Sequence, residues 1–323
     1  MNYFGSILLL LDSTVRFSIP LMLAALAGMF AERSGVIDIG LEGKMLAAAF
    51  VAASLSAVTH NVWIGLLGGI SISILLSLIH AYACVSFNGN QIVSGVALNI
   101  LVAGLAPTLS NAWFGLAGQT PQLSGDARFS HVIFPSLESI GQIPIIGAIY
   151  AVLVNDHYPL TYITFLSIPL IWWLLFHTSF GLQLRAAGEN PHALDSSGIS
   201  VTKIRYQAMI ICGILCGMAG AYLSTAQSSA FVRDMTAGKG YLALAALIFG
   251  RWNPFATVAA CLIFAFADAL QIRLQGFDIP GLGPIPVQLI QILPYVLTIL
   301  VLAGFVGKAI PPKASGIPFV KDR

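Results

Sequence analysis

The sequence predicts an all-α, polytopic membrane protein that forms a single transmembrane domain over residues 1–323. Of its 323 residues, 57% are apolar and only 9% are Asp, Glu, Lys or Arg, and the mean hydropathy is +0.87. A soluble domain carries about 25% charged residues, so this chain has too few to cover a water-facing surface. At about 20 apolar residues per span, we expect about eight to ten membrane segments, short or broken helices included. The net charge of +2 gives no reason to expect a nucleic-acid partner.

Apolar stretches mark the candidate membrane segments at 5–30, 36–58, 62–87, 91–113, 159–177, 206–227, 241–250, 254–272 and 286–306. We expect the first to be a retained helix rather than a cleaved leader, because no Lys or Arg precedes it. Within it, Asp12 and Arg16 lie one turn apart and can pair. The stretch 241–250 is too short to cross about 30 Å as a helix, so we expect a half-helix or re-entrant segment sheltered by protein. The short apolar segment 143–154 either dips into the membrane or lies on its surface.

The basic residues predict the orientation. Lys and Arg collect in the C-terminal tail, in the stretch 178–205 and at the turn 251–254, and such residues are typical of cytoplasmic loops. With these segments inside, 241–250 enters from outside. The long Gly-, Pro- and Ser-rich loop 114–142 and the segment 228–240 then face outward, as does the N-terminus.

The stretch 178–205 is expected to contain one short helix. Asn190-Pro191 has the pattern of an N-cap followed by a first-turn proline, and Gly198 suits the positive φ of a helix C-terminus. The helix between them would have about two turns. It is either part of an ordinary connecting loop or a rigid cytoplasmic knob.

The most unusual local pattern is ERSGVIDIGLEG at 32–43, where glycines interrupt a membrane segment that carries Asp38, Glu42 and Lys44. Asp38 and Glu42 are four apart, so a continuous helix would place both on one face. They either sit near the interface, where a helix N-terminus favours carboxylates, or belong to a broken helix that lines a hydrophilic path. A second Gly-opened segment at 238–250 echoes it too weakly to indicate an internal repeat.

Other chemistry-bearing patterns are sparse. Gln91, His80 and Asn99 are polar exceptions inside the spans, and such residues more often form interhelical hydrogen bonds than contact a ligand. The sequence has no GxxxxGK[ST], HExxH or GxSxG motif, and its four cysteines lie in apolar runs without metal-site spacing. We therefore expect no catalytic residue and no metal site, and any nucleotide hydrolysis would fall to a partner.

Four motifs together resemble the permease subunits of bacterial ABC importers, in particular those serving nucleosides and simple sugars such as ribose and galactose. They are ERSGVIDIGLEGKML from 32, NQIVSGVALNIL at 90–101, GLQLRAAGENPHALDSSGISVTKIRY at 181–206 and GKGYLALAALIFGRWNP at 238–254. LPYVLTILVLAGF at 293–305 is similar to the last helix of these subunits. The resemblance runs in the same order from about residue 17 to about residue 306.

The resemblance implies partners and a place in the cell. It implies a multi-pass subunit of the bacterial inner (plasma) membrane, paired with a second permease that is homologous or identical. A cytoplasmic ABC ATPase would carry the ATP and Mg, so this chain would bind no cofactor and would not be an enzyme. An extracytoplasmic substrate-binding protein would deliver the substrate. The short helix in 178–205 resembles the coupling helix that docks on the ATPase, and the matching residues are Gly181, Arg185, Gly188, Glu189, Asn190 and Pro191.

The resemblance also places the segment 35–45 and the span with Asn99 near the translocation path. The candidate path residues are Asp38, Glu42, Gln91 and Asn99. Within the segment 35–45 the sequence departs from the family pattern at two positions, with Asp38 where Asn is more common and Lys44 where an apolar residue is common. Lys44 would offset the charge of Asp38, but the two positions align poorly along a helix.

The leading hypothesis is a permease subunit that translocates nucleosides or simple sugars by alternating access under the control of a separate ATPase. Neutral hydrogen-bonding groups such as Gln91 and Asn99 suit both substrates equally. One alternative is a permease of the branched-chain amino acid type, which would need groups for an ammonium and a carboxylate. Another is an ion-coupled secondary transporter that acts alone, although the spans lack a ladder of ionisable residues.

Overall fold

The computed structural model describes residues 3–132, 150, 155–275, 278–279, 283–284, 292, 296, 299 and 310–321. The expected segments 143–154 and 286–306 lie outside the described residues except for isolated positions, and so does the 133–142 part of the outer loop. The expected surface or membrane placement of 143–154 and the expected last span therefore stay predictions.

The described chain is all-α apart from one two-residue strand pair, and seven of its helices are long and apolar enough to cross a membrane. These are α1 (Tyr3–Arg33), α2 (Leu41–Thr59), α3 (Val62–Ala81) with its π-helical extension η1 (Tyr82–Ser86), α4 (Gln91–Phe114), α7 (Pro159–His177), α10 (Val201–Tyr222) with its extension η4 (Leu223–Gln227), and α12 (Pro254–Leu274). The shorter elements are η2 (Gly125–Ala127), α8 (Ser179–Glu189), α9 (Pro191–Ser196), α11 (Lys239–Phe249), β1 (Asp278–Ile279) and β2 (Gly283–Pro284). The predicted polytopic helical class is confirmed.

Asparagine side chains fix where several helices begin. The Oδ1 atom of Asn61 accepts from the backbone N–H of Trp63 at the start of α3, and Asn90 and Asn253 cap α4 and α12 in the same way. Such a cap satisfies backbone donors that have no partner within the helix. The expected stretch 206–227 begins earlier, at Val201, because the hydroxyl of Ser200 caps that helix.

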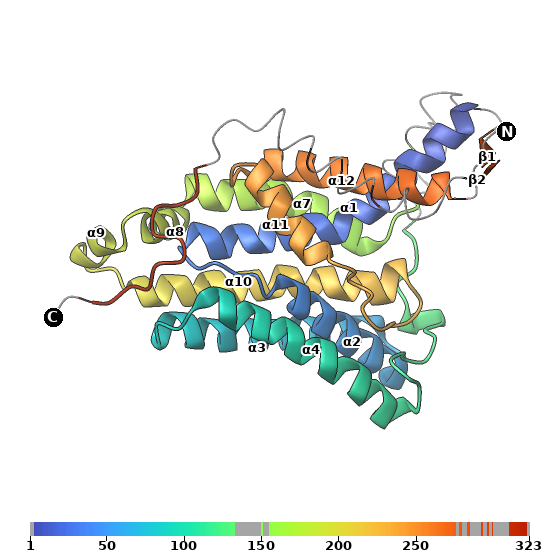
Figure 1. The fold of residues 1–323 in the computed structure, drawn as a ribbon, viewed down its shortest axis with the longest axis horizontal. Coiled ribbons are helices and arrows are strands. Elements are labelled where there is room, and N and C mark those ends of the chain that lie inside the picture. Colours follow the sequence, from blue (N-terminus) through green and yellow to red (C-terminus); the bar gives the residue numbers. More distant parts are fainter. Residues whose placement is uncertain are drawn as a thin grey trace.

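The described helices pack around α1 and α10, which contact most of the others. α1 packs against α10, α12 and α11, and α10 packs against α2 and α3. Figure 1 shows α8, α9 and the C-terminal segment gathered at one end, with the N-terminus, β1 and β2 at the other. At the former end, Arg33 Nη2 donates to the carbonyl of Trp252 at 2.8 Å, and the N–H of Ala314 donates to the carbonyl of Gly188 at 2.8 Å. The basic segments therefore share one end, as the predicted orientation requires.

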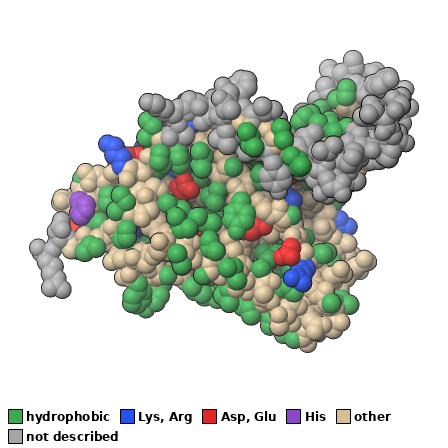
Figure 2. All heavy atoms as spheres, in the orientation of Figure 1, with side chains coloured by type: hydrophobic (Ala, Val, Ile, Leu, Met, Phe, Trp, Pro, Cys, Tyr) green, Lys and Arg blue, Asp and Glu red, His purple; other side chains and the backbone are tan. Residues whose placement is uncertain are grey.

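The outward surface of the helices is apolar. Figure 2 shows hydrophobic side chains spread across the face in view, with few charged ones between them. Ile100 on α4 and Leu166 on α7 are 69% and 71% exposed. A monomeric soluble protein rarely shows so much exposed apolar surface, whereas lipid or another membrane subunit covers such a surface without cost.

Glycines let α10 approach α3 closely. A Cβ atom at Gly217 would lie 2.6 Å from the Cα of Ile70, and one at Gly213 would lie 2.7 Å from the Cα of Ile74. These distances are shorter than any ordinary van der Waals contact, so only glycine fits. Small residues at helix contacts are typical of membrane proteins, where packing rather than hydrophobicity drives helix association.

We expect Gly217→Val to lower the thermal unfolding temperature of the purified protein in detergent by several degrees, because overpacking costs about 1–3 kcal/mol. Gly104→Val is the matched control, since nothing lies within 4 Å of a Cβ atom built at Gly104 on α4. Both changes carry the same helix-propensity cost, so equal shifts in the two variants would contradict the packing argument.

Candidate functional site

The chain between α1 and α2 is not helical. α1 ends at Arg33 and α2 begins at Leu41, and Gly35 between them has φ +90°. Asp38 therefore precedes the helix that carries Glu42, and the expectation that these two carboxylates share a helix face is wrong. The glycines are the physical reason, because they let the backbone leave helical geometry before α2 starts. We refer to residues 34–40 as the first interrupted segment.

Side chains of α3 and α4 satisfy the backbone of this segment and of the first turn of α2. The Oε1 atom of Gln91 accepts from the N–H of Ile37 at 2.7 Å, and His80 Nε2 donates to the carbonyl of Ile37 at 3.1 Å. Asn99 Nδ2 donates to the carbonyl of Ile39 at 3.0 Å, and its Oδ1 accepts from the N–H of Gly43 at 2.8 Å. Non-helical backbone is stable in a membrane protein only where other groups replace its missing hydrogen bonds.

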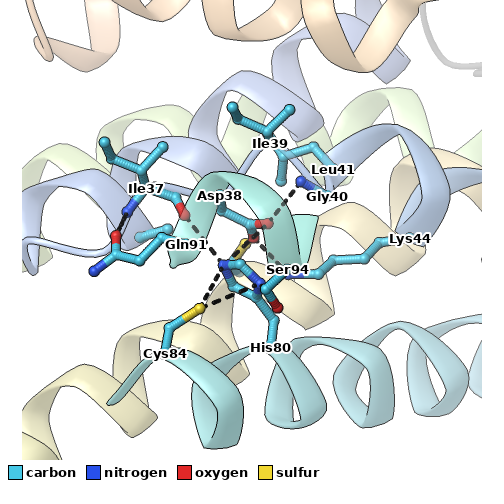
Figure 3. Close-up of polar contacts among 12 residues, drawn as sticks. Ile37, Asp38, Ile39, Gly40, Leu41, Lys44, His80, Cys84, Gln91 and Ser94 are labelled. Atoms are coloured by element: carbon cyan, nitrogen blue, oxygen red, sulfur yellow. Dashed lines mark hydrogen bonds and ion pairs between the residues drawn. The ribbon is translucent and has the colours of Figure 1, made fainter. Parts of the chain in front are cut away.

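Asp38 lies at the centre of a buried polar cluster (Figure 3). Its side chain and that of Lys44 are fully buried, and Lys44 Nζ lies 2.5 Å from Asp38 Oδ2. Asp38 Oδ1 accepts from the N–H of Gly40 at 3.1 Å, and Cys212 Sγ donates to Oδ2 at 3.3 Å. His80 Nε2 lies 4.0 Å from Oδ1. The expected poor alignment of Asp38 and Lys44 is wrong, because Asp38 lies in the non-helical segment and its side chain reaches the first turn of α2.

A second interruption precedes α11. The chain from residue 228 to 238 is not helical, and Gly238 has φ +81° where α11 begins. Both oxygens of Glu42 bind this start: Oε1 accepts from the N–H of Gly238 at 2.8 Å and Oε2 from that of Gly240 at 2.6 Å. α11 has 11 residues, about 16 Å at 1.5 Å per residue, which confirms a helix too short to span. The two Gly-opened segments of the sequence thus meet at Glu42.

A cavity of about 310 Å³ lies where these segments meet. It is lined by Glu42, Gly43, Leu46, Asn99, Ile100, Ala103, Asp234, Thr236, Ala237, Gly238 and Tyr241. The Tyr241 side chain comes from α11, and its hydroxyl oxygen accepts from Asn99 Nδ2 at 2.9 Å. A concave site with an aromatic ring and a few convergent polar groups is typical of sites for small polar molecules.

The structure separates the four candidate path residues into two groups. Glu42 and Asn99 line the cavity, whereas Asp38 and Gln91 are not among its lining residues and are 0% and 3% exposed. Sequence reasoning missed Tyr241 and Asp234. Tyr241 stands three residues into the Gly-opened segment 238–250, which was the available signal.

The second candidate region lies at the end that carries the basic segments. The predicted short helix is α9, with Asn190 Oδ1 accepting from the N–H of Ala193 at 3.1 Å, Pro191 in its first turn and φ +85° at Gly198. Glu189 and Asn190 are exposed and line a groove between α8 and α9.

The other predicted residues of this region have structural contacts. Arg185 lies over the ring of Phe176, at 5.0 Å from its centroid. A Cβ atom at Gly188 would collide with the carbonyl of Arg33, and one at Gly181 with backbone carbonyls at the end of α7. The glycines therefore let α8 pack closely on the ends of α1 and α7.

The C-terminal segment 310–321 joins the two candidate regions. The N–H of Ala314 donates to the carbonyl of Gly188 at 2.8 Å, and the N–H of Gly316 donates to that of Gly35 at 3.1 Å. Lys321 Nζ lies 3.6 Å from a carboxylate oxygen of Asp195 in α9. This one segment thus contacts the end of α8, α9 and the first interrupted segment.

The sequence is similar to known transport proteins over its whole length. It is 38% identical to the guanosine ABC transporter permease protein NupQ of Bacillus subtilis, covering 98% of this chain and 97% of that one. It is 35% identical to the nucleoside ABC transporter permease protein NupC of Lactococcus lactis, covering 100% of both chains. It is also 35% identical to the putative glucose ABC transporter permease protein TsgC13 of Haloferax volcanii, covering 84% of this chain and 79% of the relative.

Bacillus subtilis has a second permease that is similar to this chain at a lower sequence identity. The guanosine ABC transporter permease protein NupP of Bacillus subtilis is 25% identical, covering 90% of this chain and 80% of that one.

No solved structure matches the chain. The family described as branched-chain amino acid transport system / permease component matches residues 10–302. The chain therefore belongs to this family of ABC transporter permeases and is a multi-pass protein of the inner membrane.

Proposed function

We propose that this chain translocates nucleosides and that the cavity at Glu42, Asn99 and Tyr241 is its part of the path. The observation that carries the proposal is that a carboxylate, an amide and an aromatic ring face one cavity between two interrupted membrane segments. Full-length similarity to permeases named for guanosine and for nucleosides supports this substrate class.

The lining groups suit the two parts of a nucleoside. The Tyr241 side chain is 47% exposed, so its ring offers a face on which a base can stack. Its hydroxyl oxygen accepts from Asn99 and keeps its own proton to donate. The carboxylates of Glu42 and Asp234 accept from ribose hydroxyls.

Simple sugars are the second candidate, because the same carboxylates and amide bind hydroxyls and one relative is named for glucose. A branched-chain amino acid fits less well. Its carboxylate needs a cationic partner, and none of the described residues that line the cavity is Lys, Arg or His.

The cavity also supports a second permease subunit as partner. Its polar groups belong to α2, α4, α11 and the non-helical segment 228–238, next to the exposed apolar face of α4 that includes Ile100. A carboxylate facing lipid would be costly, so another membrane subunit is the suitable cover on that side. NupQ and NupP, two permeases of one organism, support a homologous rather than an identical partner.

We further propose that α9 docks on a cytoplasmic ATPase, which binds ATP and Mg while this chain holds no cofactor. α9 is capped, short and exposed at the end of the molecule with the basic segments. A substrate-binding protein would deliver the nucleoside at the opposite end. Closure of the ATPases would then move α8, α9 and the C-terminal segment. This motion would produce alternating access to the substrate path.

We expect Tyr241→Ala to raise the KM for uptake of labelled guanosine about tenfold, because base stacking on an aromatic side chain contributes about 1–3 kcal/mol. Uptake is measured in cells that express all transporter subunits, with the amount of chain in the membrane determined in parallel. Tyr82→Ala is the matched control, since Tyr82 is 58% exposed on η1, away from the cavity. An unchanged KM in Tyr241→Ala would contradict the proposed path, and efficient uptake of ribose in place of guanosine or uridine would favour the sugar reading.

We expect Asn190→Ala to reduce co-purification of the ATPase and to lower uptake, because loss of an N-cap costs about 1 kcal/mol and loosens α9. Asn61→Ala removes an equivalent cap from α3, at the other end of the molecule. If both variants retain or both lose the ATPase, the docking role of α9 is wrong.

A further inference from the structure

We propose that Asp38 and Lys44 form a positioning pair, which does not touch the substrate but holds the start of α2 so that Glu42 and Gly43 lie correctly at the cavity. This inference rests on the proposed function of the cavity as the substrate path. It gives Asp38 a different role from the direct substrate contact that the sequence suggests.

The pair bridges the interruption itself. Lys44 Nζ lies 2.5 Å from Asp38 Oδ2, while Asp38 Oδ1 accepts from the N–H of Gly40, the residue before α2. One carboxylate thus binds the last residue of the interrupted segment and the first turn of the helix. Gly40 occupies the N-cap position of α2 and has no side chain that could accept a backbone hydrogen bond there. The Asp38–Lys44 contact fixes the start of the helix instead.

The surroundings fix the pair in place. Cys212 Sγ of α10 donates to Asp38 Oδ2 at 3.3 Å, and His80 Nε2 of α3 lies 4.0 Å from Oδ1. Both side chains of the pair are 0% exposed, and neither is among the lining residues of the cavity. Any effect of the pair on a substrate therefore acts through the neighbours of Lys44 on α2.

Those neighbours have almost no free space. A Cβ atom at Gly43 would lie 2.8 Å from Asn99 Oδ1, and one at Gly240 would lie 2.6 Å from the backbone nitrogen of Glu42. A shift of α2 by a few tenths of an ångström must therefore move Asn99 or α11, and both line the cavity.

The two opposite charges predict that each single substitution is harmful and that the double substitution compensates. Removing one partner leaves the other charge buried and uncompensated, whereas replacing both with neutral groups of similar shape is tolerated. Asn at position 38 keeps an oxygen for the N–H of Gly40, and Met at position 44 fills the space of the lysine stem. The single changes Asp38→Asn and Lys44→Met should therefore be harmful, and the double change should restore function.

The test measures KM and maximal rate of labelled guanosine uptake for both single variants and the double variant, per amount of chain in the membrane. We expect each single variant to raise KM about tenfold or more and the double variant to return within about threefold of wild type. The pair Asp12–Arg16 is the matched control, because it is an ion pair at 3.0 Å that is 23% and 29% exposed. Asp12→Asn and Arg16→Met should change KM by less than about twofold.

A second readout does not depend on the substrate. A cysteine placed at Ala103, which lines the cavity from α4, should react with a small maleimide at a rate that each single variant changes and the double variant restores. If labelling behaves in this way while guanosine kinetics do not change, the pair is supported and the nucleoside path is wrong. The pair is overturned if KM and the labelling rate are both unchanged in the single variants and only the amount of chain falls, or if the double variant is no better than the worse single variant in either readout.

Discussion

The need to satisfy backbone hydrogen bonds away from water governs this molecule. A continuous membrane helix meets it internally, but the segments before α2 and α11 do not, and each unpaired backbone group would cost several kcal/mol. Side chains from neighbouring helices supply the missing partners. Gln91 and Asn99 bind the first interrupted segment, and Glu42 binds the second. The same contacts assemble the cavity, so its polar character is a direct result of how the interruptions are stabilised.

This view explains why the polar residues inside the spans divide into two kinds. Gln91 and His80 contact the same residue, Ile37, from α4 and α3 and are buried, so their role in the described structure is to hold the backbone. Asn99 does both tasks, because its amide binds the backbone of Gly43 and Ile39 and also faces the cavity beside Tyr241. Polarity inside a membrane segment is therefore not by itself evidence of substrate contact.

The sequence predicted the local features well. Caps and glycines anticipated α9, the length of the apolar run anticipated α11, and the one-turn spacing anticipated the Asp12–Arg16 pair. Errors arose where helical periodicity was applied across an interruption, at Asp38, Glu42 and Lys44. The hydrogen bonds from the N–H of Gly238 to Glu42 and from Asn99 to Tyr241 join positions 196 and 142 residues apart, and no local pattern encodes such contacts.

The bond pattern of Glu42 has a consequence for motion. A carboxylate that accepts two backbone N–H bonds holds them more strongly than a neutral acceptor would, at about 1.5–3 kcal/mol each. Separating α2 from α11 would break both bonds at once. A conformational change that alternates access to the cavity and preserves both bonds must move α2 and α11 together as one rigid body. Gly35, which has a positive φ inside the first interrupted segment and takes part in neither bond, is the natural hinge of that body.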